Sequence, residues 1–195
     1  MYVTCANQNS AKLSRIRIPK YEISRMGSAY PMLLTTDRLT LRPFQEADVT
    51  PYSEIVADPE VMRLITGEAE TFEAARRYLE EVLRSEAERG YSRYAVLLRE
   101  PEELIGFCGF KLIDGEVDFG WRYGKRHWNN GYGTEAAREV LKYGQEILQL
   151  PLVVSVALPE NTASIRIMQK IGMQRDGFGS WGGKQTIRYV ARTAA

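Results

Sequence analysis

The segment best suited to chemistry is a glycine-containing loop that leads into a predicted helix. It reads Trp128-Asn129-Asn130-Gly131-Tyr132-Gly133-Thr134-Glu135-Ala136. Such a loop presents free backbone N–H groups at a helix N-terminus, where the helix dipole also favours a bound phosphate. Glycine lets the backbone approach a pyrophosphate closely. The same glycines also fit an ordinary tight turn, so the loop alone leaves both interpretations open.

The loop lacks the features of two familiar nucleotide-binding patterns. No Gly-Lys-Ser/Thr follows the glycines, which excludes a Walker A loop. The third glycine of a Rossmann fingerprint is also missing, and no long run of parallel βαβ units surrounds the segment.

Residues that bind metal ions are scarce in this sequence. The chain has two cysteines, Cys5 and Cys108, in no metal-binding pattern, and one histidine, His127. We predict neither a metal site nor a disulfide framework. Cys108 is expected to be a buried strand thiol, and His127 a surface or loop residue.

The composition is that of an ordinary globular protein. The 195 residues fit one domain or one domain with a tail, and 44% hydrophobic with 26% charged residues exclude wholesale disorder. With 26 basic and 25 acidic residues, the chain does not resemble a dedicated nucleic-acid binder. No apolar run suits a transmembrane helix and the start lacks a secretory signal, so we expect a cytoplasmic protein.

We divide the chain into a basic N-terminal extension, residues 1–32, and a folded domain, residues 33–195. Residues 1–31 carry five basic residues and one acidic residue. Short basic tails are common, but this one suggests a weak tether to RNA or the ribosome.

The domain alternates predicted strands and helices. Strands are expected at 39–44, 94–98, 104–113, 117–123 and 152–157, with two more between 173 and 191. Helices are expected at 46–57, from the Thr71 cap to Gly90, at 133–150, and from the Asn161 cap to Gly172. The second helix has an apolar face that includes Phe72, Ala75 and Leu79.

This order predicts a single α/β domain. The middle strands form an antiparallel meander, and Asp114-Gly115 is a hairpin turn. The helix at 133–150 makes a crossover to a parallel neighbour. We therefore expect a mixed, mostly antiparallel sheet of about six to seven strands, flanked by about four helices.

Linked motifs in this domain resemble the GNAT acetyltransferase superfamily, and within it the RimJ/RimL-like protein N-acetyltransferases. The motifs are Asp118-Phe119-Gly120-Trp121, the loop that opens at Trp128, Asn161-Thr162-Ala163-Ser164, and Lys170-Ile171-Gly172-Met173. Trp128 follows Gly120 by eight residues, and Asn161 follows Gly131 by 30. The segment from Thr36 to Arg42 looks like the first strand of that branch, so the resemblance spans residues 34–191.

The resemblance implies a GNAT-like fold and an acetyl-CoA-dependent transferase. Backbone groups of Trp121, Arg122 and Tyr123 would contact the pantetheine arm. Asn161 would lie near the pantetheine or the thioester. The pyrophosphate would be held by backbone N–H groups of Asn129, Asn130, Gly131, Tyr132, Gly133 and Thr134.

The resemblance also suggests Asp118 as the general base, acting through a water molecule. An ordinary aspartate pKa of about 3.9 makes a poor direct base, so Asp118 would need desolvation or a relay. The alternative is a surface acid or a salt-bridge partner. Glu116 lies on the same strand face and is a rival for the role.

The proton donor for the departing thiolate is less evident. Met168 occupies the position where many superfamily members have a tyrosine, and Ser164 is the nearest substitute donor. Both Ser164 and Asn161 are also explained as residues that satisfy a helix start.

The acceptor is not encoded in any motif. We expect direct attack by a primary amine in a ternary complex, most favourably the N-terminal amine of a protein or peptide. A small amine or an antibiotic is the alternative acceptor, and a non-catalytic CoA sensor is the alternative function. Trp121, Trp181 and Tyr91 could line an acceptor cleft or simply pack. The oligomeric state stays open, a homodimer included.

Overall fold

The computed structural model describes residues 33–193. The strands are β1 (Leu34–Thr35), β2 (Leu39–Pro43), β3 (Arg93–Arg99), β4 (Glu102–Ile113), β5 (Glu116–Tyr123), β6 (Leu152–Ala157), β7 (Gln174–Trp181) and β8 (Lys184–Arg192). The α-helices are α2 (Val49–Val56), α3 (Pro59–Met62), α4 (Phe72–Arg89), α5 (Tyr132–Glu146) and α6 (Thr162–Lys170). Two short 3₁₀ helices, η1 (Glu46–Asp48) and η2 (Lys125–His127), complete the described elements.

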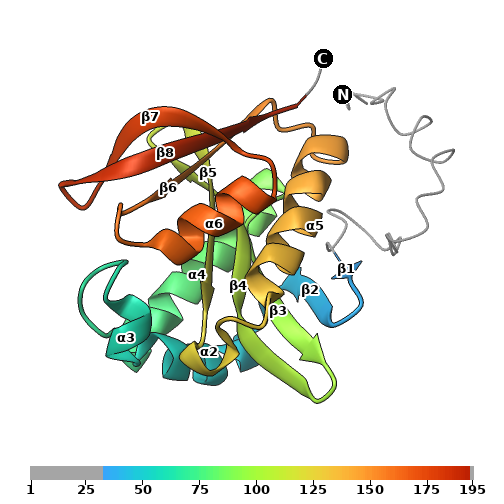
Figure 1. Cartoon of the computed structure of the whole chain (residues 1–195). Helices are drawn as coiled ribbons and strands as arrows, with labels where there is room; N and C mark the ends of the chain where they lie inside the picture. Colours follow the sequence, from blue (N-terminus) through green and yellow to red (C-terminus); the bar gives the residue numbers. More distant parts are fainter. Residues whose placement is uncertain (1–32, 194–195) are drawn as a thin grey trace, which may run out of the picture.

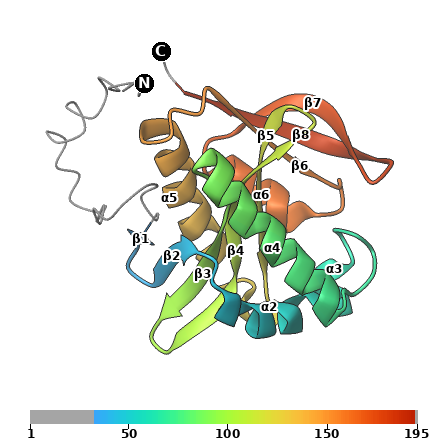
Figure 2. The same cartoon turned by 180° about the vertical axis from the view of Figure 1, so that it is seen from behind.

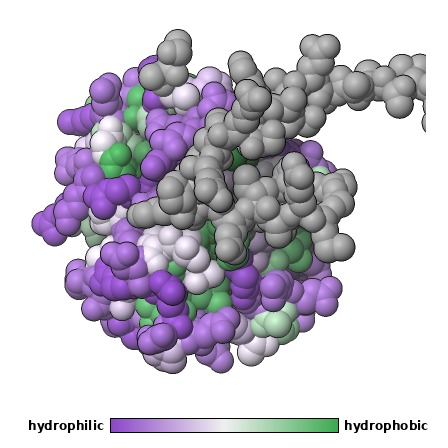
Figure 3. All heavy atoms as spheres, turned by 90° about the vertical axis from the view of Figure 1, so that its right-hand side faces the viewer, coloured by the Kyte–Doolittle hydropathy of each residue, from purple (hydrophilic) through white to green (hydrophobic). Residues whose placement is uncertain are grey.

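The strands form one sheet in the order β1-β2-β3-β4-β5-β6-β8-β7. Helices α5 and α6 cover one face, and α2 and α4 cover the other (Figures 1 and 2). Each face has its own core. One core contains Ala137 and Val140 of α5 against Phe110 and Phe119, and the other contains Leu79 of α4 against Phe107. Figure 3 faces the α5 side of the molecule, and most of the residues that the grey atoms do not cover there are hydrophilic.

The sheet opens between β5 and β6. These two neighbours are the parallel pair, and their register has a single pair of residues, Asp118 opposite Val154. All other neighbouring strands are antiparallel, with two to eight residue pairs each. Beyond Asp118, the backbone groups of the second half of β5 are therefore free from pairing with β6.

Local residues set the helix boundaries. The hydroxyl of Thr71 accepts a hydrogen bond from Ala74 N–H at 3.2 Å and begins α4. Gly90 ends the same helix in the left-handed region, with φ of 73°. At the β4–β5 hairpin, Asp114 and Gly115 both have positive φ, as a two-residue turn of this type requires.

The predicted single α/β domain with a mixed, mostly antiparallel sheet is confirmed. The sheet has eight strands rather than six or seven, because Leu34 and Thr35 form a two-residue edge strand too short to show a period. Phe72 was wrongly placed on the buried face of α4, since it is 47% exposed at the first position of the helix.

Some predictions concern residues that the structure does not describe. The proposed extension at residues 1–32, its RNA tether and Cys5 all lie outside residues 33–193. Within the described range, every helix is too short or too polar to span a bilayer. In the same part of the chain, no three His, Cys, Asp or Glu side chains are grouped so that they could hold a metal ion.

Candidate functional site

A cavity of about 300 Å³ lies where β5 and β6 separate. Asp118, Gly120 and Arg122 of β5 line one wall, and residues 155–157 of β6 with Leu158 directly after it line another. The rest of the lining comes from α6, from α4 and the segment before it, from β3 and β4, and from the β7–β8 hairpin. The cavity thus joins the α6 side of the sheet to the α4 side through the gap between the strands.

The glycine-containing loop lies at the start of α5, on the α6 side of this gap. Asn129 and Gly131 have positive φ values of 62° and 83°, and Gly131 is the N-cap of α5. Within residues 33–193, the backbone N–H groups of residues 129–133 donate to no acceptor. Free N–H groups at a helix N-terminus suit a phosphate.

Neighbouring side chains hold the loop against the sheet. The indole N–H of Trp128 donates to the carbonyl of Tyr123 at 2.9 Å. Gly133 lies close to its neighbours, because a Cβ atom there would come 2.9 Å from Cδ1 of Ile167 and 3.1 Å from the ring of Tyr123. The first turn of α5 therefore packs directly on β5 and α6.

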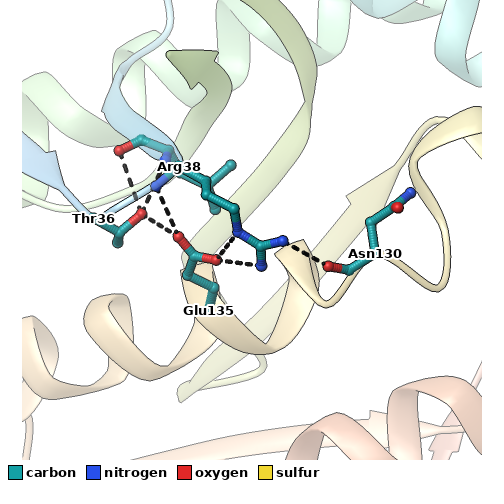
Figure 4. Close-up of polar contacts among 5 residues, drawn as sticks. Thr36, Arg38, Asn130 and Glu135 are labelled. Carbon is teal, nitrogen blue, oxygen red and sulfur yellow. Dashed lines mark hydrogen bonds and ion pairs between the residues drawn. The ribbon is translucent and has the colours of Figure 1, made fainter. Parts of the chain in front are cut away.

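Glu135 links the loop to the start of β2. Its carboxylate accepts hydrogen bonds from Thr36 Oγ1 at 2.5 Å and from Arg38 Nε at 2.8 Å (Figure 4). Arg38 also donates to the carbonyl oxygen of Asn130 at 3.0 Å, and its guanidinium lies 4.6 Å from the centre of the Tyr132 ring. Arg38 and Glu135 thus fix the backbone of the loop that offers the free N–H groups.

The contacts with Thr36 and Arg38 shift the pKa of Glu135. Burial acts to raise the pKa of this carboxyl, but hydrogen bonds from Thr36 and Arg38 outweigh burial and lower it. A lowered pKa means that Glu135 stabilises the fold above its unfolded pKa of about 4.3. That stabilisation is lost as the pH falls through the lower pKa of the folded state.

We predict that Glu135→Gln reduces the free energy of unfolding at pH 7 by on the order of 1 kcal/mol, a modest value because solvent screens the half-exposed Arg38. The difference from wild type begins to shrink as the pH falls below the unfolded pKa of about 4.3, and it disappears below the lower pKa of the folded state, where the wild-type carboxyl is protonated too. Urea denaturation at a series of pH values measures it. Glu54→Gln, at an exposed position with no ion pair among the described residues, is the control. A difference that is the same at pH 7 and pH 3 contradicts the prediction.

Asp118 lies at the point where the strands separate and is paired with a buried cation. Its Oδ2 accepts a hydrogen bond from Nη2 of Arg93, the first residue of β3. Arg93 also donates to the backbone carbonyls of Gly109 and Asp118. Burial disfavours its charged form, but Asp118 outweighs burial, so the pKa of Arg93 is raised and the guanidinium stays charged.

The rival carboxylate, Glu116, faces a different partner. It accepts hydrogen bonds from Arg188 at 2.7 and 2.8 Å, and Arg188 also binds Asp176 at 3.0 Å. These contacts lower the pKa of Glu116, chiefly through the hydrogen bond from Arg188. Glu116 does not line the cavity, whereas Asp118 does.

Three side chains of α6 or its cap border the cavity. Asn161 Oδ1 accepts a hydrogen bond from the N–H of Ser164 at 3.2 Å, which confirms the predicted N-cap. Ser164 lines the cavity, and so does Met168, whose side chain is fully buried. The thioether places an apolar, non-acidic group at the site where a tyrosine was considered.

Comparison of the sequence with known protein families identifies its family. The profile of the acetyltransferase (GNAT) domain matches residues 38–174. The chain belongs to the GNAT acetyltransferase family. It is 35% identical over 149 residues to the uncharacterized N-acetyltransferase YnaD of Bacillus subtilis, a match that covers 75% of this chain and 85% of YnaD.

Solved structures agree with this membership. A GNAT-family acetyltransferase from Bacillus anthracis is 28% identical, with a TM-score of 0.73, over 83% of this chain and 98% of that one. RimL, a ribosomal L7/L12 alpha-N-protein acetyltransferase solved with coenzyme A, is 14% identical, with a TM-score of 0.69, over 81% of this chain and 96% of RimL. The second likeness is one of fold alone.

As a GNAT N-acetyltransferase, the protein uses acetyl-CoA as acetyl donor. The described residues fit this molecule at two points. Unpaired N–H groups at 129–133 suit its pyrophosphate. The edge of β5 at Trp121, Arg122 and Tyr123 does not pair with β6 and suits the amide groups of its pantetheine arm, although the carbonyl of Tyr123 already accepts a hydrogen bond from Trp128.

Two residues considered from the sequence lie away from the chemistry of this GNAT fold. Cys108 is fully buried and burial raises its pKa, so the thiol is unreactive. His127 lies in η2 with its side chain only 10% exposed, so it is more covered than a surface residue. Its Nε2 lies 3.1 Å from Glu103.

Sequence reasoning missed the roles of Arg38, Glu135 and Arg93 in this GNAT site. Arg93 is a charged residue at the start of a strand, yet it is only 6% exposed and lines the cavity. Gly120 makes room for it, because a Cβ atom there would lie 3.1 to 3.2 Å from the guanidinium. A glycine inside a strand was the one available indication of such a close approach.

Of the three aromatic candidates for the acceptor cleft, Trp121 and Trp181 line the cavity and Tyr91 does not.

Proposed function

We propose that this N-acetyltransferase moves the acetyl group from acetyl-CoA to a primary amine, most favourably the α-amine of a protein or peptide, by direct attack in a ternary complex. The observation that carries the proposal is the cavity through the sheet. It runs from Asn161, Ser164 and Met168 on the α6 side to the α4 side, where Asp118 and Arg93 meet.

In this proposal the backbone groups bind and orient acetyl-CoA. The free N–H groups of residues 129–133 hold the pyrophosphate. The N–H of Thr134, predicted to join them, donates instead to the carbonyl of Gly131 at 3.1 Å. The backbone of residues 121–123 and the amide of Asn161 hold the pantetheine. The attacking nitrogen forms a bond to the acetyl carbon, and the bond from that carbon to sulfur breaks. A backbone N–H at the end of β5 supports the carbonyl oxygen as charge develops on it.

The step requires an acceptor for the proton of the attacking amine and a hydrogen-bond donor for the departing sulfur. Asp118 accepts the proton of the attacking amine, through a water molecule, and Ser164 donates a hydrogen bond to the departing sulfur. Asp118 is held by Arg93, and a carboxylate is a weak base. An acceptor that is already partly unprotonated therefore suits this site.

This requirement favours an α-amine. With a pKa of about 8, roughly a tenth of an α-amine is unprotonated at pH 7, against fewer than about one in a thousand for a lysine amine of pKa about 10.4. RimL, named above for an alpha-N-protein substrate, shares the fold. So does AAC(6')-Ib, solved with acetyl-CoA and Parmomycin, at 19% identity and a TM-score of 0.68, so a small amine is the alternative acceptor.

A non-catalytic CoA sensor is the second candidate function. Met168 favours it, because a buried thioether cannot deliver a proton to the leaving thiolate. The two candidates differ in turnover and not in binding.

Calorimetric titration with acetyl-CoA, followed by an assay of free thiol over a panel of peptides and small amines, tests the proposal. We expect binding in the micromolar range and thiol release with at least one amine. Binding without release across the panel favours the sensor. Absence of binding overturns the assignment of the loop at 129–134.

A further inference from the structure

The turn between β1 and β2 contacts the first turn of α5 through one carboxylate (Figure 4). Glu135 accepts hydrogen bonds from the hydroxyl of Thr36 at 2.5 Å, from the backbone N–H of Arg38 at 3.2 Å, and from the Arg38 guanidinium at 2.5 and 2.8 Å. The Arg38 side chain is 48% exposed, and an ion pair at such an exposed position adds little to stability. So many contacts beside the loop at 129–133 indicate a role in arranging that loop.

The turn that carries Arg38 is itself held in place. The N–H of Thr36 donates to the carbonyl of Leu39 at 2.9 Å, and the Thr36 hydroxyl accepts a hydrogen bond from the N–H of Leu39 at 2.9 Å. The N–H of Arg99 in β3 donates to the carbonyl of Arg38 at 3.0 Å. A side chain on a backbone fixed in this way can set the geometry of the groups that it contacts.

Arg38 determines the direction of one peptide group in the loop. Its Nη1 donates to the carbonyl of Asn130 at 3.0 Å (Figure 4). The peptide bond between Asn130 and Gly131 is trans, so the N–H of Gly131 points away from that carbonyl. This N–H donates to no acceptor within residues 33–193. Arg38 therefore occupies the oxygen side of the peptide group and leaves the N–H side for a ligand.

Arg38 also balances a negative charge next to the loop. Glu135 lies in the first turn of α5, and its lowered pKa keeps the carboxyl ionised at neutral pH. Without a partner, this carboxylate would repel a phosphate bound at the same end of the helix. The guanidinium pairs with it and lies 4.6 Å from the centre of the Tyr132 ring, in the same turn. The N-terminus of α5 thus keeps its preference for an anion.

We infer that Arg38 is a positioning residue for the pyrophosphate of acetyl-CoA, although it lies outside the loop proposed to bind it. The guanidinium holds the carbonyl of Asn130, so that the N–H of Gly131 faces the phosphates, and it compensates the charge of Glu135. Loss of Arg38 therefore weakens binding of the cosubstrate and leaves the transfer step unchanged. The inference rests on the function proposed above.

Arg38→Met tests this role, because methionine keeps an apolar, unbranched side chain and removes the charge and every donor. In calorimetric titrations, we expect the affinities for acetyl-CoA and for ADP to fall about tenfold, since both ligands carry the pyrophosphate. S-acetylpantetheine lacks the pyrophosphate, so we expect kcat/KM with this acetyl donor to equal that of wild type. Thermal unfolding is measured for every variant.

Arg76→Met is the matched control. The Arg76 side chain is 49% exposed and pairs with Glu73 and Glu80 on α4, as Arg38 pairs with Glu135 on α5. It has no contact with the loop at 129–133 among its hydrogen bonds. We expect its affinity for acetyl-CoA to match that of wild type.

Each outcome for Arg38→Met has a distinct meaning. Wild-type affinity for acetyl-CoA overturns the inference, and a lower unfolding midpoint beside it shows a purely structural role. An equal loss with S-acetylpantetheine overturns the link to the pyrophosphate. If the wild-type protein binds acetyl-CoA but transfers to no amine, the proposed reaction is overturned, and the affinities for acetyl-CoA and ADP decide the role of Arg38. Absence of binding by the wild-type protein overturns both proposals.

The double variant Arg38→Met/Glu135→Gln separates the two effects of Arg38. Its affinity for acetyl-CoA is expected to lie between those of Arg38→Met and wild type, because the repelling carboxylate is gone while the Asn130 carbonyl is still not held. An affinity equal to that of Arg38→Met contradicts the compensation of charge. Full wild-type affinity contradicts the role of the contact with Asn130.

Discussion

Asp118→Asn is expected to lower turnover about 100-fold or more while acetyl-CoA affinity stays within a few-fold of wild type. General-base catalysis contributes about 10²- to 10⁴-fold, and an amide cannot accept the proton. Asp118 also compensates the charge of the buried Arg93, so the variant is expected to be less stable as well. Thermal unfolding therefore accompanies the assay, and turnover is measured well below the unfolding midpoint.

Glu116→Gln is the matched control for this change. Glu116 lies two residues away on β5 and also pairs with an arginine, Arg188, but it does not line the cavity. We expect its turnover to equal that of wild type. Unchanged turnover in Asp118→Asn removes Asp118 from the mechanism, and loss of turnover in Glu116→Gln alone makes Glu116 the base.

Gly133→Ala is expected to weaken acetyl-CoA binding about tenfold, which corresponds to about 1.4 kcal/mol. The added methyl group would press on Ile167 and on the ring of Tyr123 and push the first turn of α5 away from the sheet. The N–H groups proposed to hold the pyrophosphate would then lose their alignment. Alanine favours helix over glycine, so a loss of affinity cannot come from poorer helix formation. Calorimetric titration measures the dissociation constant.

Gly124→Ala is the control for the loop. Gly124 lies before η2 with an ordinary φ of −56°, and the nearest atoms to an added Cβ are at 3.5 Å, a normal contact distance. We expect its affinity for acetyl-CoA to match wild type. Equal affinity in Gly133→Ala would mean that this turn of α5 does not contact the cosubstrate.

Several elements could be predicted from the sequence because neighbouring residues determine them. Thr71 and Asn161 cap helices through side-chain contacts three residues ahead, at Ala74 and Ser164. Gly90 and Gly115 take backbone angles that other residues disfavour. The linked motifs from Asp118 to Met173 indicated the superfamily, which the family match confirms.

The partners of the charged residues were decided only by the tertiary structure. Arg93 and Asp118 are 25 residues apart, and Arg38 and Glu135 are 97 apart. Strand register brings Arg93 opposite Gly109, which lies opposite Gly120, so that a cation from β3 reaches a carboxylate on β5 across two glycines. No local pattern encodes such a meeting.

The sequence by itself thus determined most of the elements, the antiparallel meander of the middle strands and the family, but neither β1 nor α3. The tertiary structure decided which of two similar carboxylates borders the cavity, which arginines are buried, and which residues hold the loop before α5. The physical reason is the range of the interactions. Caps, turns and periodic apolar faces act over a few residues, whereas ion pairs and cavities depend on how strands from distant parts of the chain align and where β5 and β6 separate.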